Sequence, residues 1–231
     1  MATVLTESRP RRKTVRRANG FTTIRTMADL LRDLGDIPAE RVWLTPTPGT
    51  ATEKDVIEAE AKFNRLCELV DGTLVEKTMG FREAREALVL GTILENYTEK
   101  HDLGIITGAD GTIHLMPKLV RIPDVSFVAW SRLPGRQLPD EPIPDLVPNL
   151  AIEILSASNT PGEMKRKLRE YFETGVEQVW FVDGLARSFE IFASPTESEV
   201  FSGKQTIKTG KLLPGLKLSV EAFFNRVHRK K

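Results

Sequence analysis

The sequence predicts a mixed α/β domain, and three patterns support this prediction. Apolar runs of strand length occupy 150–155 and 179–182. Stretches with the period of a helix occupy 81–100 and 161–174. Because strands come both before and after helices, in mixed order, we expect a mixed sheet flanked by helices.

The composition of the 231-residue chain suits one globular domain with appendages. The single cysteine, Cys67, excludes an internal disulfide, and with only three scattered histidines it excludes a Cys/His zinc site. No apolar stretch approaches the ~20 residues that span a bilayer, and no hydrophobic segment follows the basic N-terminus as in a secretory signal. We therefore expect a cytoplasmic protein without membrane contact.

The charge is distributed unevenly. Residues 1–26 hold seven basic residues and one acidic residue, whereas the rest of the chain has an acidic excess. The basic arm could follow nucleic-acid phosphates or be a plain solvated tail, and the pattern leaves both open. We expect three regions, namely a flexible basic arm over 1–26, a helical lead-in and linker over 27–50, and one domain over 51–227.

Turn and capping residues mark the first elements. An amphipathic helix over 27–35 ends at a glycine, and Thr52 followed by Asp55 is typical of the start of a second helix. The pair Asp71 and Gly72 separates two short apolar runs. These residues accept the positive φ angles of a type I′ turn, so the segment predicts a β-hairpin.

The later elements follow from similar signals. Thr160 to Glu163, with proline at the first helical position, matches a capping box, so we expect the Glu163 side chain to pair with Thr160 at the start of a helix over 161–174. Further short strands, including a meander, and a closing helix are expected at 105–107, 112–115, 125–130, 187–192, 199–207 and 218–227.

Two acidic residues occupy strand positions where burying a carboxylate is costly. Glu153 lies inside an apolar run, on the same face as Ala151 and Leu155, and Asp124 opens the strand after a proline. Carboxylates in this setting suit a divalent metal, which polarises a phosphate and lowers the pKa of an attacking water. The usual position of a partner lysine, two residues after the second acid, holds Leu155, so the lysine must come from elsewhere.

The helix after Glu153 offers the missing cation. On a helical wheel, Lys165 and Lys167 flank the apolar stripe on opposite sides, and periodicity alone does not choose between them. Tyr171 lies four residues after Lys167 on the same flank, which slightly favours Lys167.

Five segments in order resemble a known family. The segments are 67–72, 122–125, 153–156, 167–176 and 179–183. Their order and spacing are similar to those of the Uma-two family, whose members are classed as restriction endonucleases of the PD-(D/E)XK nuclease fold. The resemblance covers roughly residues 50 to 225. It implies a restriction-endonuclease-like mixed sheet flanked by helices, with an N-terminal hairpin and a helical extension.

The resemblance also implies an activity, that of a divalent-metal-dependent endonuclease that hydrolyses DNA phosphodiester bonds. Asp124 and Glu153, with the backbone carbonyl of Ile154, would hold Mg²⁺ or Mn²⁺. Lys167 corresponds to the lysine that lies on the following helix in this family, and it would orient the water or stabilise the transition state. DNA would be the partner. The protein could also form a homodimer, and the sequence leaves this question open.

Two accessory residues and one departure complete the comparison. Glu68 matches the hairpin glutamate of the family, and it would be an outer metal ligand or an exposed sheet residue; Tyr171 accompanies Lys167. Many members have a histidine where 81–83 reads Phe-Arg-Glu, so any role of that histidine cannot be transferred. The alternative function is a module with the same fold that binds nucleic acid or protein without cleavage. Two features favour it, namely Leu155 at the usual position of the lysine and the acidic excess of the chain after residue 26.

Overall fold

The computed structural model describes residue 24 and residues 26–228. The predicted basic arm over 1–26 therefore lies outside the described residues, apart from positions 24 and 26. The helices are α1 (Met27–Asp33), α2 (Glu53–Phe63), α3 (Phe81–Lys100), α4 (Pro161–Thr174) and α5 (Val220–His228), with 3₁₀ turns η1 (Ala39–Arg41), η2 (Trp130–Arg132) and η3 (Pro134–Arg136). The strands are β1 (Cys67–Val70), β2 (Thr73–Glu76), β3 (Gly104–Thr107), β4 (Ile113–Met116), β5 (Leu119–Arg121), β6 (Val125–Ala129), β7 (Leu150–Leu155), β8 (Gln178–Asp183), β9 (Ser188–Ser194), β10 (Glu197–Ser202), β11 (Thr206–Lys208) and β12 (Lys217–Ser219).

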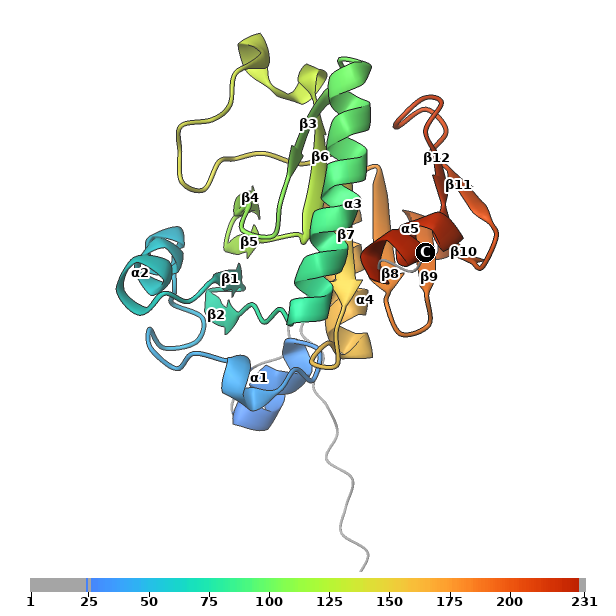
Figure 1. Ribbon diagram of the computed structural model, residues 1–231. Coiled ribbons are helices and arrows are strands. Elements are labelled where there is room, and N and C mark those ends of the chain that lie inside the picture. Colours follow the sequence, from blue (N-terminus) through green and yellow to red (C-terminus); the bar gives the residue numbers. More distant parts are fainter. Residues whose placement is uncertain (1–23, 25, 229–231) are drawn as a thin grey trace, which may run out of the picture.

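A six-stranded mixed sheet with the order β10-β9-β8-β7-β6-β3 forms the centre of the fold (Figure 1). Strands β7 and β8 are parallel because α4 connects them as a crossover helix, and the other neighbours are antiparallel. A four-stranded antiparallel sheet, β2-β1-β5-β4, and the small pair β11-β12 complete the strands. The predicted mixed α/β class is confirmed.

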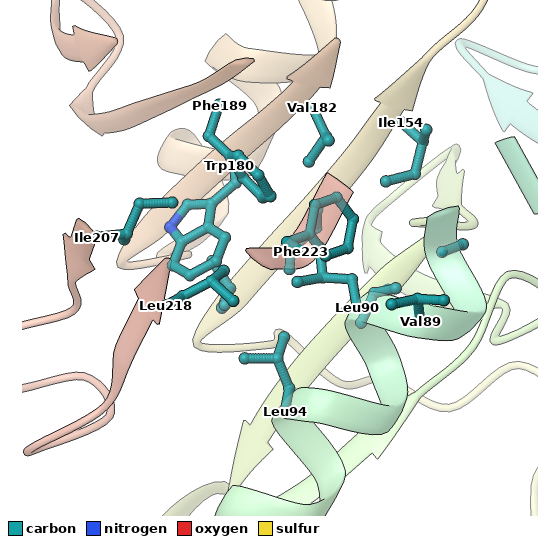
Figure 2. Packing of buried hydrophobic residues seen from close by; sticks show 14 of the residues in the cluster. Val89, Leu90, Leu94, Ile154, Trp180, Val182, Phe189, Ile207, Leu218 and Phe223 are labelled. Atoms are coloured by element: carbon teal, nitrogen blue, oxygen red, sulfur yellow. The ribbon is translucent and has the colours of Figure 1, made fainter. Parts of the chain in front are cut away.

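Helices cover both faces of the central sheet. On one face Ile152, Ile154 and Trp180 belong to a core that includes residues of α3 and α5 (Figure 2). On the other face Ala151 packs with α4. Because side chains alternate along a strand, Glu153 shares the face of Ala151, as the sequence predicted, and this face points towards α4. Within the described part of the chain, no helix has the length and apolar character needed to cross a membrane.

Local signals predicted most elements. The long helices α3 and α4 occupy the ranges expected for them. Asp71 and Gly72 have φ angles of 50° and 74°, as a type I′ turn between β1 and β2 requires. Thr52 and Asp55 form a capping box at the start of α2. These residues act through contacts within four positions, so their conformation follows from the local sequence.

One strand prediction is wrong in extent, and one strand was missed. The predicted strand over 199–207 is two strands, because β10 ends at Ser202 and β11 pairs with β12 in a separate sheet. Strand β5 was not expected. It has three residues, too few to show a period of two, and it is defined by its pairing with β1 and β4.

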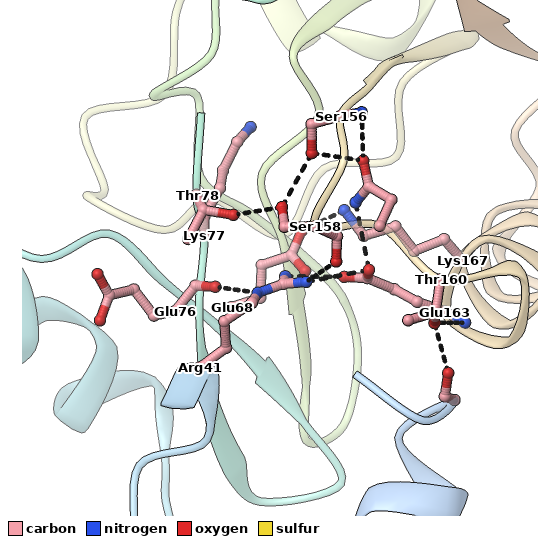
Figure 3. A network of polar contacts seen from close by, with 12 residues as sticks. Arg41, Glu68, Glu76, Lys77, Thr78, Ser156, Ser158, Thr160, Glu163 and Lys167 are labelled. Atoms are coloured by element: carbon pink, nitrogen blue, oxygen red, sulfur yellow. Dashed lines mark hydrogen bonds and ion pairs between the residues drawn. The ribbon is translucent and has the colours of Figure 1, made fainter. Parts of the chain in front are cut away.

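Glu163 departs from the capping box that the sequence predicted. Its backbone N–H does donate to Oγ1 of Thr160, at 3.1 Å. Its carboxylate instead accepts from both terminal nitrogens of Arg41, at 2.8 and 3.0 Å (Figure 3). Both charged side chains are buried, and a buried guanidinium needs an ionic partner more than an amide N–H does. The ion pair of Arg41 and Glu163 thus links η1 to the start of α4.

Candidate active site

Glu153 lies at the centre of a buried polar cluster between the sheet and α4. Nζ of Lys167 donates to its Oε2 at 2.9 Å, and the hydroxyl of Tyr171 donates to its Oε1 at 2.5 Å. Lys167 and Tyr171 are four residues apart, which places both on one face of α4. This helix therefore positions both oxygens of the carboxylate.

Lys167, and not Lys165, is the lysine that α4 presents to the sheet. Lys167 is 3% exposed, whereas Lys165 lies at the surface. Nζ of Lys167 is also 3.1 Å from Oε1 of Glu68. Burial lowers the pKa of Lys167, but the negative charges of Glu153 and Glu68 outweigh burial and hold that pKa above its usual range. The side chain is thus a fixed ammonium ion.

Asp124 reaches the same cluster from the position directly before β6, the strand next to β7. Its backbone N–H donates to the carbonyl of Ile152 at 3.0 Å, and its Oδ2 accepts from the N–H of Ile154 at 2.7 Å. Its Oδ1 lies 2.8 Å from Nζ of Lys77. Ile154 thus contacts Asp124 through its amide, and the metal-binding role of its carbonyl stays a prediction.

The two carboxylates of Asp124 and Glu153 are close enough to influence each other. Burial raises the pKa of Glu153, and the negative charges of Asp124 and Glu68 act in the same direction. Lys167 and Lys77 oppose this effect. The cluster therefore brings three acidic side chains together with two lysines whose positive charge offsets part of the repulsion.

Glu68 is a buried member of this cluster, so the alternative of an exposed sheet residue is wrong. It is 1% exposed and accepts from Arg121 at 2.6 Å and from the N–H of Ile122 at 3.2 Å. Burial alone would raise the pKa of Glu68, but Lys167 and Arg121 bring that pKa far below its ordinary value. Glu68 is accordingly a permanent anion beside Lys167.

Sequence reasoning missed three charged residues of this cluster, Lys77, Arg121 and Glu170. Arg121 links Glu68 to Glu170 through its guanidinium. It lies between Val120 and Ile122 in an apolar segment, so the argument from buried charge that identified Glu153 would have found it. Lys77 directly follows β2 and carries no such signal, because its partner comes from a distant part of the chain.

A cavity of about 550 Å³ opens beside Asp124, between α3 and strands β3 and β6. Apolar side chains such as Leu88 and Val125 form much of its wall, together with Glu95 and Asn96. None of the described residues that line it is lysine or arginine. The cavity gives access to the edge of the polar cluster at Asp124, but it does not supply positive charge for a phosphate backbone.

The chemistry of the donors fits a hard divalent cation. The available ligands are carboxylate oxygens, and Mg²⁺ is commonly bound by one or two carboxylates, with water and substrate phosphate completing its shell. A group of three or more Asp, Glu, His or Cys side chains that could hold an ion is absent from residues 24 and 26–228. The carboxylates of Asp124 and Glu153 offer oxygen donors of the kind that such an ion prefers.

The architecture is that of a restriction-endonuclease-like protein. The chain is similar in structure to a protein from Anabaena variabilis ATCC 29413 described as "a putative nuclease belonging to DUF820", with a TM-score of 0.63 and 17% sequence identity over 71% of this chain and 92% of that chain. The family Uma2, described as "Putative restriction endonuclease", matches residues 61–221. The chain belongs to the Uma2 family, which confirms the resemblance inferred from its motifs. No curated protein matches it.

Proposed function

We propose that this protein is a divalent-metal-dependent endonuclease that hydrolyses phosphodiester bonds of DNA. The observation that carries the proposal is the convergence of Asp124, Glu153 and Lys167, which lie directly before β6, on the neighbouring strand β7 and on the helix that follows β7. Clusters of buried ionisable groups with shifted pKa values are typical of catalytic sites. Membership of the Uma2 family supports the same activity.

Asp124 and Glu153 would hold Mg²⁺ or Mn²⁺. The metal would polarise the scissile phosphate and lower the pKa of the attacking water. The protein's own contribution is to fix the ligands in place. The N–H of Ile154 holds one oxygen of Asp124, and Tyr171 with Lys167 holds Glu153, so neither carboxylate has to be ordered when the metal binds.

Lys167 serves as a cation in this proposal. Because Glu153 and Glu68 hold its pKa above the usual range, it does not lose a proton near neutral pH and is a poor general base. A fixed ammonium instead stabilises the negative charge that develops on the phosphorus oxygens in the transition state. The raised pKa disfavours abstraction of a proton from water. Of the two roles expected for this lysine, orienting the water or stabilising the transition state, the proposal assigns the second.

A module that binds without cleaving is the competing function. Two observations favour it, namely that Asp124, Glu153 and Glu68 each already pair with a cation, and that no lysine or arginine lines the described wall of the cavity beside Asp124. Such a module would retain the fold and bind nucleic acid or a protein partner. It would show no metal-dependent cleavage.

Metal binding tests the proposed site. We expect Mn²⁺ or Mg²⁺ at a concentration of ~100 times Kd to raise the Tm by roughly 5 to 10 °C, because the ion binds only the folded state. Glu153→Gln removes one ligand charge and should abolish this rise. Glu173→Gln, at an exposed position of α4, is the matched control and should behave as wild type. Equal shifts in wild type and Glu153→Gln would refute the assignment.

A further inference from the structure

Lys77 is a second lysine at the proposed metal site, and it contacts Asp124 directly. The residue follows β2, and its backbone N–H donates to the carbonyl of Leu66 at 2.8 Å, so the hairpin fixes its position. Its side chain is 8% exposed. Lys77 and Lys167 come from different elements, the first from the end of the hairpin and the second from α4 (Figure 3).

The ammonium of Lys77 contacts the oxygen of Asp124 that a bound metal would need. Nζ lies 2.8 Å from Oδ1, whereas Oδ2 already accepts from the N–H of Ile154. Nζ also donates to the carbonyl of Ile122 at 2.5 Å, which holds the ammonium at this place. Both oxygens of Asp124 therefore have partners, and one of those partners is a cation.

Charge repulsion follows from this geometry. A divalent ion on Oδ1 of Asp124 would lie within a few ångströms of the ammonium of Lys77, at a site largely shielded from water. Two cations on one buried oxygen repel each other strongly. Metal binding therefore requires that the ammonium of Lys77 leave Oδ1. Lys167 does not contact Asp124; its partners are Glu68 and the other proposed ligand, Glu153.

We propose that Lys77 is an internal counter-cation that competes with the divalent metal for Asp124 and so weakens metal affinity. This inference rests on the proposed metal site. In the metal-free protein, Lys77 neutralises Asp124 and keeps the buried cluster stable. On metal binding, its ammonium moves away from Oδ1, and the carbonyl of Ile122 remains as its anchor at the edge of the cluster.

Calorimetric titration of the full chain with Mn²⁺ tests this competition. Lys77→Met removes the charge and keeps much of the length of the side chain, and we expect it to bind Mn²⁺ at least tenfold more tightly than wild type. Lys77→Arg keeps a cation and should show no such gain. Lys77→Gln removes the charge but keeps a hydrogen-bond donor, so it replaces Lys77→Met should that variant fail to fold. Lys165→Met, at an exposed lysine of α4, is the matched control.

A Kd for Mn²⁺ that falls in Lys77→Met or Lys77→Gln and not in Lys77→Arg or Lys165→Met supports the competition. An unchanged or higher Kd in both uncharged variants overturns it; if wild type binds Mn²⁺ and Glu153→Gln does not, the proposed metal site survives that result. If neither wild type nor the uncharged variants bind Mn²⁺, the inference and the metal site are both wrong.

Discussion

The phenol of Tyr171 donates a hydrogen bond of 2.5 Å to Oε1 of Glu153, and both side chains are buried between α4 and the central sheet. Burial raises the pKa of Tyr171, and the negative charge of Glu153 raises it further, so the phenol keeps its proton and remains a donor. In the proposed site Tyr171 would therefore be a positioning residue, because it contacts the proposed metal ligand Glu153.

Tyr171→Phe removes this donor while preserving the ring. We expect a loss of stability of about 1 to 3 kcal/mol, because one oxygen of Glu153 loses its buried partner. We also expect the Kd for Mn²⁺ to rise by about tenfold, since a less ordered ligand binds less well. Urea unfolding and calorimetry measure the two effects. Tyr97→Phe loses a hydrogen bond to Pro214 far from the cluster, so it should leave the metal Kd unchanged. An unchanged Kd in both variants would remove the positioning role.

The buried pair of Arg41 and Glu163 should be a large contributor to stability. Arg41→Met leaves the carboxylate of Glu163 without its main ionic partner, and we expect the free energy of unfolding to fall by about 3 to 5 kcal/mol. Arg169→Ala breaks an exposed pair with Glu173 and should cost less than about 1 kcal/mol. Urea denaturation compares the two, and similar losses would show that burial does not decide the value of these pairs.

The buried carboxyl group of Glu86 leads us to expect that the stability of the protein depends on pH. It is fully buried on α3, packs against Gly184, and has no hydrogen-bond partner for either oxygen among the described residues. Burial raises its pKa to about 7, with Glu83 and Asp183 acting in the same direction and Arg82 opposing them. The folded state therefore keeps this proton at pH values where the unfolded chain has lost it. The contribution of this retained proton to stability is complete below the pKa that Glu86 has in the unfolded chain, and it is lost as the pH rises through about 7.

Glu86→Gln removes this titration. Relative to wild type, the variant should gain on the order of 2 kcal/mol of stability between pH 5 and pH 8, allowing for partial solvent screening. Thermal unfolding at the two pH values measures the gain, and Glu99→Gln at an exposed position of the same helix is the control. A difference between Glu86→Gln and wild type that is the same at both pH values would show that Glu86 does not carry this dependence.

The site was predictable where burial or local spacing identifies a residue. A carboxylate inside the apolar run of β7 identified Glu153, and the four-residue spacing to Tyr171 favoured Lys167. Both signals depend on neighbours within the same element. The resemblance to a known family then selected Lys167 over Lys165, and the structure places Lys167 on Glu153.

The contacts that the sequence did not predict are tertiary. Arg41 and Glu163 are 122 residues apart, and the capping motif beside Glu163 pointed to a closer partner. Lys77 reaches Asp124 because β1 of the hairpin pairs with β5, and Asp124 lies in the short link between β5 and β6. A local pattern shows that a charge is buried, but it does not show which distant charge will neutralise it.

DNA cleavage by matched lysine variants tests the central claim most directly. We expect wild type to nick plasmid or cleave short duplexes only with Mg²⁺ or Mn²⁺, and Lys167→Ala to lose at least about 100-fold in rate while it still folds and binds metal. Lys165→Ala should retain nearly full activity, and Asp124→Ala serves as the blank. Loss of activity in Lys165→Ala with a normal Lys167→Ala, or a wild type no faster than the blank on every substrate, would contradict the account.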